Sequence, residues 1–227
     1  FNKILELVPL SSTDEDDEVY LTKKNDIFDA GLGNDKIWGN DGDDIIDGNK
    51  GNDSLFGDNG NDTLIGGKGN DKLFGGEGND IYIFNKGDGH DTIMDDIGNN
   101  VIKFGEGINK EDLVISRNPY NEKGVKFLFK NNPNDSISVN SIDALSIEFA
   151  NGDKLGPKEI KKLPLFGSDA NDTIRGFFSN RNTFIGNGGN DILEGDYGGD
   201  IYIFNKGDGK DTIMDYGGID VIKLNDF

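Results

Sequence analysis

The sequence predicts an all-β fold in which a parallel β-roll, with two nine-residue units per coil, alternates with a small β-rich capping module. Six consecutive nine-residue units run from Ala30 to Ile83, and a shorter set of similar units follows residue 166. The segment from Asp80 to Asp95 recurs from Asp200 to Asp215 with one change. A nine-residue period and a repeated flanking segment are typical of stacked, quasi-linear folds.

The units of the first set carry the same residue types at fixed positions. Position two holds only Gly, Asn or Asp, which tolerate left-handed backbone angles, and position four is always glycine. Position six is always aspartate. Position eight is large and mostly aliphatic: Ile37, Ile46, Leu55, Leu64, Leu73 and Tyr82. This pattern predicts a turn bearing a carboxylate, then a three-residue strand whose middle side chain points inward.

Two units per coil place loops two units apart over each other, with strands about 4.8 Å apart. The expected pairs are Asp35 with Asp53, Asp44 with Asp62, Asp53 with Asp71, and Asp62 with Asp80. Each pair, with carbonyls of the glycine turns, forms a cage of hard oxygens of the kind that calcium prefers. One inward aliphatic per nine residues buries little apolar surface, so we expect the segment not to fold without a cation.

The candidate metal residues are the position-six aspartates and the glycines of the turns. They are Asp26, Gly31, Gly33, Asp35, Gly42, Asp44, Gly51, Asp53, Gly60, Asp62, Gly67, Gly69, Asp71, Gly76, Gly78, Asp80, Asp172, Gly189, Asp191 and Asp200. We expect about five to seven calcium ions, which would offset about ten to fourteen negative charges.

Composition supports this interpretation and excludes others. Only 33% of the 227 residues are hydrophobic and the net charge is −20, which argues against nucleic acid and anionic membrane surfaces as partners. The absence of cysteine excludes disulfides and thiolate metal sites. The sequence shows no signal peptide and no apolar run long enough for a transmembrane helix.

Five segments are expected along the chain. They are 1–17, the tail of a preceding module and an acidic entry; 18–83, the first β-roll block; 84–166, the flanking or capping module; 167–203, a second, shorter block; and 204–227, the start of a second, truncated flanking module. Asp17 and Asp26 fall on position six of two degenerate units that lack the position-four glycine. Because the second flanking module repeats only the start of the first, the chain is expected to be a fragment of a longer tandem array.

The flanking segment predicts short strands separated by turns. Asp80–Asp95 indicates a strand, a Gly-Asp-Gly turn and a second strand. Further strands are expected near 101–104, 113–115, 125–129, 137–139 and 146–149, with a hairpin at Asn151–Gly152. Such a module would cover the open end of the roll, whose backbone groups are otherwise unpaired.

The second block is less regular than the first. Asp172, Asp191 and Asp200 hold position six, but the unit Gly176–Ile185 is ten residues long and has asparagines in place of the aspartate. We expect a bulged, metal-poor coil there.

These glycine- and aspartate-rich nonapeptides resemble the repeats-in-toxin (RTX) proteins of Gram-negative bacteria, over about residues 18–83 and 167–203. The flanking segments, DIYIFNKGDGHDTI, VIKFGEGINKEDLVISR and SIEFANGDKL, are similar to the haemolysin-type calcium-binding-related segment of Frp-type, iron-regulated RTX proteins of Neisseria. The resemblance implies a parallel β-roll with calcium on the position-six aspartates and turn carbonyls. It also implies export, unfolded, by type I secretion machinery to the outside or the cell surface.

The residues needed for catalysis are not found in the sequence. The single histidine, His90, is replaced by Lys210 in the second copy of its segment. The zinc-protease motif HExxH and the hydrolase motif GxSxG are absent, and none of the five prolines follows an aspartate, as Frp-type self-cleavage would need. The sequence therefore predicts a protein that is not an enzyme.

Two alternatives stay open. The flanking module could recognise a host receptor or glycan as part of an adhesin or toxin, or the chain could be the accessory domain of a secreted hydrolase. Trp38, Phe56 and Phe74 are expected to point out of the roll, where they either pack against neighbours or form an exposed binding patch.

Overall fold

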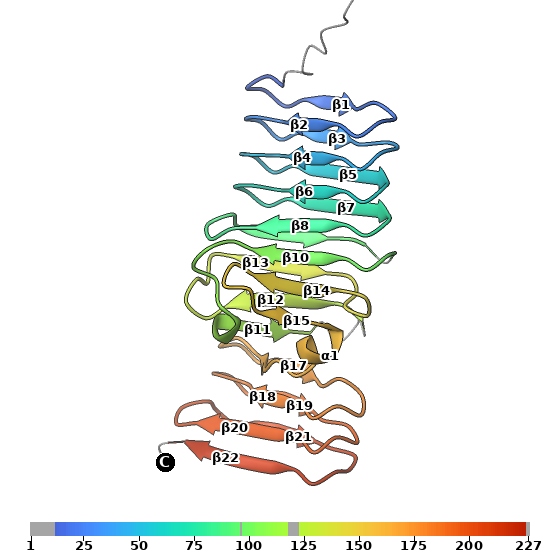
Figure 1. The fold of residues 1–227 in the computed structure, drawn as a ribbon. Helices are drawn as coiled ribbons and strands as arrows, with labels where there is room; N and C mark the ends of the chain where they lie inside the picture. Colours follow the sequence, from blue (N-terminus) through green and yellow to red (C-terminus); the bar gives the residue numbers. More distant parts are fainter. Residues whose placement is uncertain (1–11, 96, 118–122, 226–227) are drawn as a thin grey trace, which may run out of the picture.

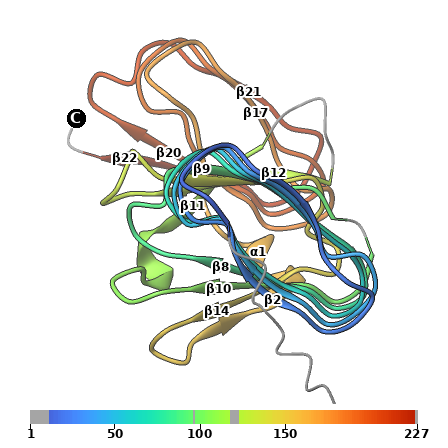
Figure 2. The ribbon, with the colours of Figure 1, turned by 90° about the horizontal axis from the view of Figure 1, so that it is seen from above.

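The computed structural model describes residues 12–95, 97–117 and 123–225, which form a solenoid of stacked strands (Figure 1). Viewed along the axis, successive coils of the first block superimpose (Figure 2). The expected all-β parallel roll is confirmed. Within the described ranges, helix is limited to the 3₁₀ helix η1 (Lys110–Asp112) and to α1 (Pro157–Ile160). No helix in this part of the chain combines the length and apolar character needed to span a bilayer.

One sheet runs the length of the solenoid. Its spatial order is β1 (Glu18–Tyr20), β3 (Lys36–Trp38), β5 (Ser54–Asn59), β7 (Lys72–Glu77), β9 (His90–Ile93), β13 (Ser136–Val139), β12 (Val125–Phe129), β11 (Leu113–Ser116), β16 (Leu165–Phe166), β18 (Thr183–Ile185), β20 (Ile201–Asn205) and β22 (Val221–Asn225). Its pairs are parallel except for β11–β12 and β12–β13.

Two smaller sheets complete the coils. The first has the order β15 (Lys154–Leu155), β14 (Ser146–Phe149), β10 (Val101–Phe104), β8 (Ile81–Phe84), β6 (Thr63–Ile65), β4 (Ile45–Asp47) and β2 (Ile27–Asp29). The second consists of β17 (Thr173–Arg175), β19 (Ile192–Glu194) and β21 (Thr212–Met214). Only β14–β15 is antiparallel among these pairs.

The strand register confirms two nonapeptides per coil. In the long sheet, Ile37 aligns with Leu55 and Leu55 with Leu73, while Leu64 aligns with Tyr82 on the opposite side. All six position-eight side chains are at most 2% exposed, so they form the core of the first block as expected. Each nonapeptide therefore supplies one strand and one core side chain.

The turns explain the glycine and asparagine positions. Asn40 and Asp58 at position two have φ of 71° and 70°, in the left-handed region that these residue types tolerate. At position four, Gly51 has φ of 144°, and a side chain there would collide with the carbonyl of Gly33 in the preceding coil. Turns of successive coils are thus stacked as closely as the strands.

The degenerate units before Ala30 also form coils. Val19 lies in β1 and Phe28 in β2, and Phe28 is only 3% exposed. The start of the predicted 1–17 segment, residues 1–11, lies outside the described residues.

Strands of the flanking segment form where the sequence predicts them. β14 and β15 make the expected hairpin around Asn151 and Gly152, whose φ is 90°. The strands on either side of the Gly-Asp-Gly turn, β8 and β9, lie in different sheets, because each pairs with the strand one coil away. The turn therefore continues the coil.

Residues 84–166, the segment expected to cover the open end of the roll, lie between the two blocks. The segment does pair with the end of the first block, through β8–β10 and β9–β13. The same sheet then continues through β12 and β11 to β16, which pairs with β18 of the second block. Residues 84–166 therefore join the two blocks, and the backbone groups at the end of each find partners within one continuous sheet.

Candidate calcium sites

The position-six aspartates form a hydrogen-bonded ladder through the turns. The backbone N–H of each one donates to Oδ1 of the aspartate two units later: Asp35 to Asp53 at 2.7 Å, and Asp44 to Asp62, Asp53 to Asp71 and Asp62 to Asp80 at 2.8 Å. The expected partners do lie over each other. They meet as N–H and carboxylate, and each carboxylate keeps its second oxygen for another ligand.

That second oxygen has no hydrogen-bond partner and is buried. Among the described residues, this holds for Oδ2 of Asp35, Asp44, Asp53, Asp62, Asp71, Asp80 and Asp191. Each of these residues is at most 1% exposed. An unpaired buried carboxylate oxygen is costly unless a proton or a cation neutralises it. The ladder therefore has the donor-free, negatively charged oxygens that a metal ion requires.

The pKa values of these carboxyls agree with the burial. Burial raises the pKa of Asp53 and Asp80 to about 7, and the neighbouring carboxylates add to the increase. Burial likewise raises the pKa of Asp62 and Asp71 to about 6, although backbone N–H groups oppose it. At neutral pH, the charge on the ladder is therefore poorly compensated by the protein itself.

From Gly39 on, the first residue of each unit in the first block is a glycine, which leaves room beside the free oxygen. A side chain at Gly48 would collide with Asp53 Oδ2 and the carbonyl oxygen of Gly66, and one at Gly57 with Asp62 Oδ2 and the carbonyl oxygen of Gly75. A carboxylate oxygen and a turn carbonyl thus converge on one space. This donor set of hard oxygens fits calcium.

The glycines predicted from the sequence shape the turns. Their φ angles all lie between 88° and 151°. They are Gly31, Gly33, Gly42, Gly51, Gly60, Gly67, Gly69, Gly76, Gly78 and Gly189. The position-one glycines, which border the free oxygens, were not among the predicted residues; their regular spacing is the signal that could have found them.

In three of the predicted aspartates, the second carboxylate oxygen does have a hydrogen-bond donor. Oδ2 of Asp26 accepts hydrogen bonds from the backbone N–H and hydroxyl of Thr22, at 2.8 and 2.6 Å. Oδ2 of Asp172 accepts the equivalent pair from Ser168, at 2.6 and 2.7 Å. Oδ2 of Asp200 accepts the N–H of Asp196 at 3.3 Å. Asp26 and Asp172 each have two short hydrogen bonds on Oδ2, so these two carboxylates need a cation less than those of the ladder. Asp200 has only the one, longer contact on Oδ2.

Asn182 takes the aspartate's place in the irregular unit. Its backbone N–H donates to Asp200 Oδ1 at 2.7 Å, as in the ladder. Its side-chain amide donates to the carbonyls of Phe177 and Asn180 and to Asp200 Oδ1, at 3.1–3.2 Å. The side-chain amide thus donates to turn carbonyls at the place where an aspartate would offer a carboxylate oxygen, a geometry that favours the predicted metal-poor coil.

The ladder continues beyond the predicted residues. The N–H of Asp71 donates to Oδ1 of Asp91 at 3.0 Å, and the N–H of Asp80 to Oδ1 of Asn100 at 2.8 Å. In the second block the equivalent acceptors are Asp211 and Asp220. The nine-residue pattern did not predict these four residues, because the Gly-Asp-Gly segment lengthens the coil to 20 residues.

The outward aromatic residues form a stack on the long sheet. Ring centroids lie 4.4 Å apart for Tyr20 and Trp38, 5.2 Å for Trp38 and Phe56, and 4.5 Å for Phe56 and Phe74.

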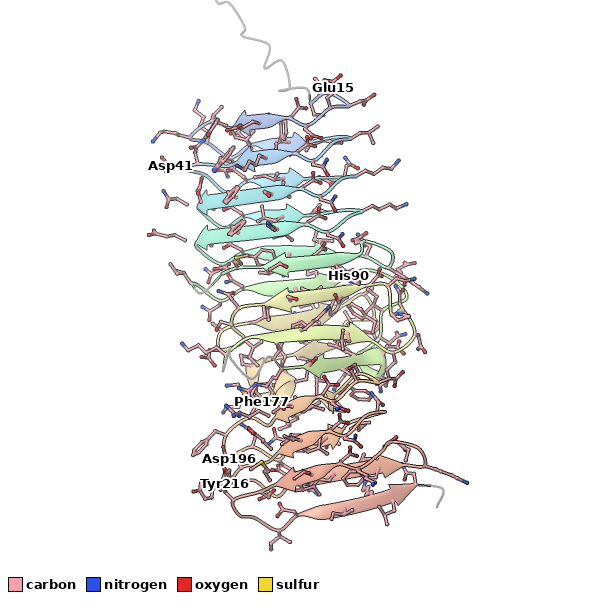
Figure 3. All side chains as sticks on the ribbon, turned by 180° about the vertical axis from the view of Figure 1, so that it is seen from behind. Glu15, Asp41, His90, Phe177, Asp196 and Tyr216 are labelled. Atoms are coloured by element: carbon pink, nitrogen blue, oxygen red, sulfur yellow. The ribbon has the colours of Figure 1, made fainter. Side chains whose placement is uncertain are left out.

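His90, labelled in Figure 3, is exposed, and its Nδ1 lies 2.9 Å from Ser136 Oγ.

The fold and the ladder define a class of protein, the parallel β-roll with carboxylates in its turns. A family model described as "RTX calcium-binding nonapeptide repeat (4 copies)" matches residues 20–55, 56–88 and 178–209. These parts of the chain are RTX calcium-binding nonapeptide repeats, a structural and not a catalytic element. Such repeats are typical of secreted proteins. No curated protein matches the sequence significantly.

Two solved structures show local similarity. The solution structure of the AlgE6R3 subunit of the mannuronan C5-epimerase from Azotobacter vinelandii is 23% identical, over 64% of this chain and 84% of that chain, with a TM-score of 0.39. The extracellular lipase LipA from Serratia marcescens is 20% identical, over 86% of this chain and 33% of the lipase, with a TM-score of 0.36. At these scores, neither activity is transferred to this chain.

Proposed function

We propose that this chain is a non-catalytic, calcium-folded segment of a larger secreted bacterial protein. Its ligands would be the position-six aspartates and turn carbonyls, and its parent would be a toxin-like or Frp-like protein exported by type I secretion machinery. The observation that carries the proposal is the row of buried carboxylate oxygens without hydrogen-bond partners, from Asp35 to Asp80. When bound, calcium supplies the positive charge that these oxygens lack.

Because calcium would bind only the folded chain, such a ladder makes folding depend on the calcium concentration. An ion that binds only the folded state adds RT ln(1 + [Ca²⁺]/Kd), or about 2.7 kcal/mol at a hundred times Kd. Four such ions supply roughly 11 kcal/mol, comparable to the whole stability of a typical domain. At the low calcium concentration of a cytosol this term nearly vanishes, while the repulsion within the ladder remains. The chain would stay unfolded before export and fold outside the cell.

Residues 84–166 support a structural role for the whole chain. Their strands belong to the same sheets as the neighbouring blocks, through pairs such as β9–β13 and β11–β16. A module built into the sheet transmits the fold from one block to the next, which favours this role over a separate glycan- or receptor-binding module.

Circular dichroism of the full chain tests the proposal, first in chelator and then with rising calcium or magnesium. We expect a disordered spectrum in chelator and a steep, cooperative gain of β-structure with calcium. Magnesium should substitute poorly because it demands a tighter octahedron and keeps its waters. A β-rich spectrum already present in chelator would overturn the switch.

A further inference from the structure

Aspartate replaces the position-one glycine at two places in the chain. Asp95 lies one coil after Gly75, and Asp215 lies one coil after Gly195. Asp215 directly follows β21, and Asp95 follows β9 with Met94 between them. Elsewhere in the first block this position is filled by residues such as Gly48 and Gly57, whose neighbours leave no room for a side chain. An acidic side chain at this position is therefore brought next to the ladder.

Both aspartates point at a ladder carboxylate. A side chain at Gly75 would collide with Asp80 Oδ2, Asp95 Oδ2 and the hydroxyl of Tyr82, so these three oxygens surround one small space. The Tyr82 hydroxyl donates to Asp95 Oδ2 at 2.5 Å. Asp80 is fully buried, and its Oδ2 accepts no hydrogen bond.

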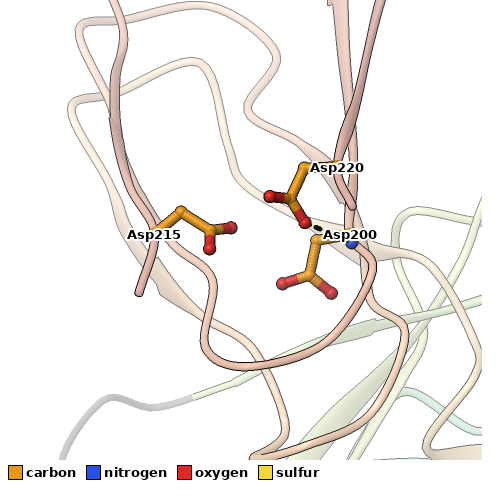
Figure 4. A group of neighbouring side chains, drawn as sticks. All are labelled: Asp200, Asp215 and Asp220. Carbon is orange, nitrogen blue, oxygen red and sulfur yellow. Dashed lines mark hydrogen bonds between the residues drawn. The ribbon is translucent and has the colours of Figure 1, made fainter. Parts of the chain in front are cut away.

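The second copy repeats the arrangement. A side chain at Gly195 would collide with Asp200 Oδ2, Asp215 Oδ2 and the Tyr202 hydroxyl, and that hydroxyl donates to Asp215 Oδ2 at 2.5 Å. Carboxylate oxygens of Asp200, Asp215 and Asp220 all lie within 4.8 Å of one another (Figure 4). Two segments separated by 120 residues thus build the same group of oxygens.

One tyrosine hydroxyl cannot neutralise two facing carboxylates. Its single proton goes to Asp95 in the first copy, which leaves Asp80 Oδ2 with a negative neighbour and no donor. Carboxylate oxygens that converge in this way are ligands for a hard divalent cation. A cavity of about 100 Å³, lined by Tyr82, Asp95 and Asn100, adjoins the group. It has room for about three water molecules, which calcium commonly retains as ligands.

We propose that each group is a calcium site made mainly of side-chain oxygens, with Asp95 and Asp215 as ligands that the nonapeptide pattern does not specify. Asp80 and Asp95 form the first site, and Asp200, Asp215 and Asp220 form the second. Tyr82 and Tyr202 are positioning residues that orient the added carboxylate. This inference rests on the proposed calcium-binding function and extends it to the junction after each block.

The two sites differ in charge. Asn100 occupies, in the first copy, the ladder position that Asp220 holds in the second, so the first site has two carboxylates and the second has three. Calcium affinity rises with the number of charged ligands. We therefore expect Asn100→Asp to tighten binding at the first site by about tenfold.

Native mass spectrometry of the full chain in calcium tests the proposal. Asp95→Asn and Asp215→Asn should each lose one ion, because the amide keeps the shape of the side chain and removes its charge. Asp153→Asn, the same change in an exposed hairpin, should lose none. Circular dichroism of each variant in calcium, together with the gain of affinity in Asn100→Asp, separates lost binding from lost folding.

The outcomes are distinguishable from those of the proposed function. If Asp62→Asn loses an ion while Asp95→Asn and Asp215→Asn keep the full count, the paired carboxyls share a proton and the junction sites are wrong. If the unmodified chain binds no calcium, or Asp62→Asn also keeps the full count, the proposed function is wrong as well. An Asn100→Asp variant with unchanged affinity would also contradict the junction sites.

Discussion

The backbone N–H of Asp62 donates to Oδ1 of Asp80 at 2.8 Å, while Oδ2 of Asp80 is buried without a partner. One oxygen of each ladder carboxylate therefore holds adjacent coils together, and the other is left for a ligand. Removing such a carboxylate should weaken both coil stacking and calcium binding, so the ladder couples the two.

The position of an aspartate in the ladder should decide how much it contributes to calcium-dependent folding. Asp53→Ala and Asp62→Ala should each raise the calcium midpoint of folding more than Asp26→Ala does, because the Asp26 carboxylate already accepts two hydrogen bonds from Thr22. Calcium titration by circular dichroism measures the three midpoints. Equal midpoints would contradict the distinction between ladder and entry aspartates.

Acid should partly replace calcium. Burial raises the pKa of Asp53 to about 7 and of Asp62 to about 6 in the folded chain, against about 3.9 for an unperturbed aspartate. A raised folded-state pKa adds stability that is complete below the unfolded value and is lost as pH rises through about 6 to 7.

The calcium-free chain should therefore show more β-structure at about pH 5 than at about pH 8. Protons should also compete with the ion, so the calcium midpoint should rise as pH falls. Circular dichroism of calcium-free protein across this range is the measurement. A β-signal that grows with increasing pH in the absence of calcium would contradict the assigned burial.

Asn182→Asp should create a calcium site in the irregular coil. The amide that now donates to the carbonyls of Phe177 and Asn180 would become a carboxylate facing Asp200. Without calcium the variant should be less stable than the unmodified chain, and with calcium it should bind one additional ion by native mass spectrometry. Asn151→Asp, in an exposed turn, is the control that should bind none.

The second block should bind fewer ions than the first. Among the described residues of the second block, only Asp191 has a buried Oδ2 without a hydrogen-bond partner, whereas six aspartates of the first block have one. The Asp191→Asn variant should bind about one calcium ion fewer than the unmodified chain, because the proposed site at the junction after the block is separate and stays filled. Anomalous scattering that places as many ions in 167–203 as in 30–83 would refute this difference.

Gly57→Ala should destabilise the calcium-bound fold by about 1–3 kcal/mol, since the added methyl group collides with Asp62 Oδ2 and the Gly75 carbonyl. Gly156→Ala is a matched control, because its methyl group meets only the end of the Glu159 side chain, 3.0 Å away. Denaturant unfolding in calcium gives both values. Equal effects of the two changes would count against the position-one glycines as part of the sites.

The strand pattern and the ladder partners were readable from local spacing. Leu55 and Asp53 recur in register with residues 18 positions away, so a two-unit coil follows directly from the period. Asp91 and Asn100 were missed because the coil lengthens to 20 residues at the Gly-Asp-Gly turn. A fixed period in the sequence predicts contacts only where the coil length stays constant.

Sequence alone determined the class of fold, the inward side chains and the calcium-type turns, because each depends on residue types within nine positions. Tertiary structure decided which carboxylates keep a free oxygen. Asp26 and Asp53 hold the same place in their units, yet Thr22 satisfies one while the next coil buries the other. It also placed Asp95 beside Asp80, because residues 15 positions apart meet only when the chain has completed its turn around the coil.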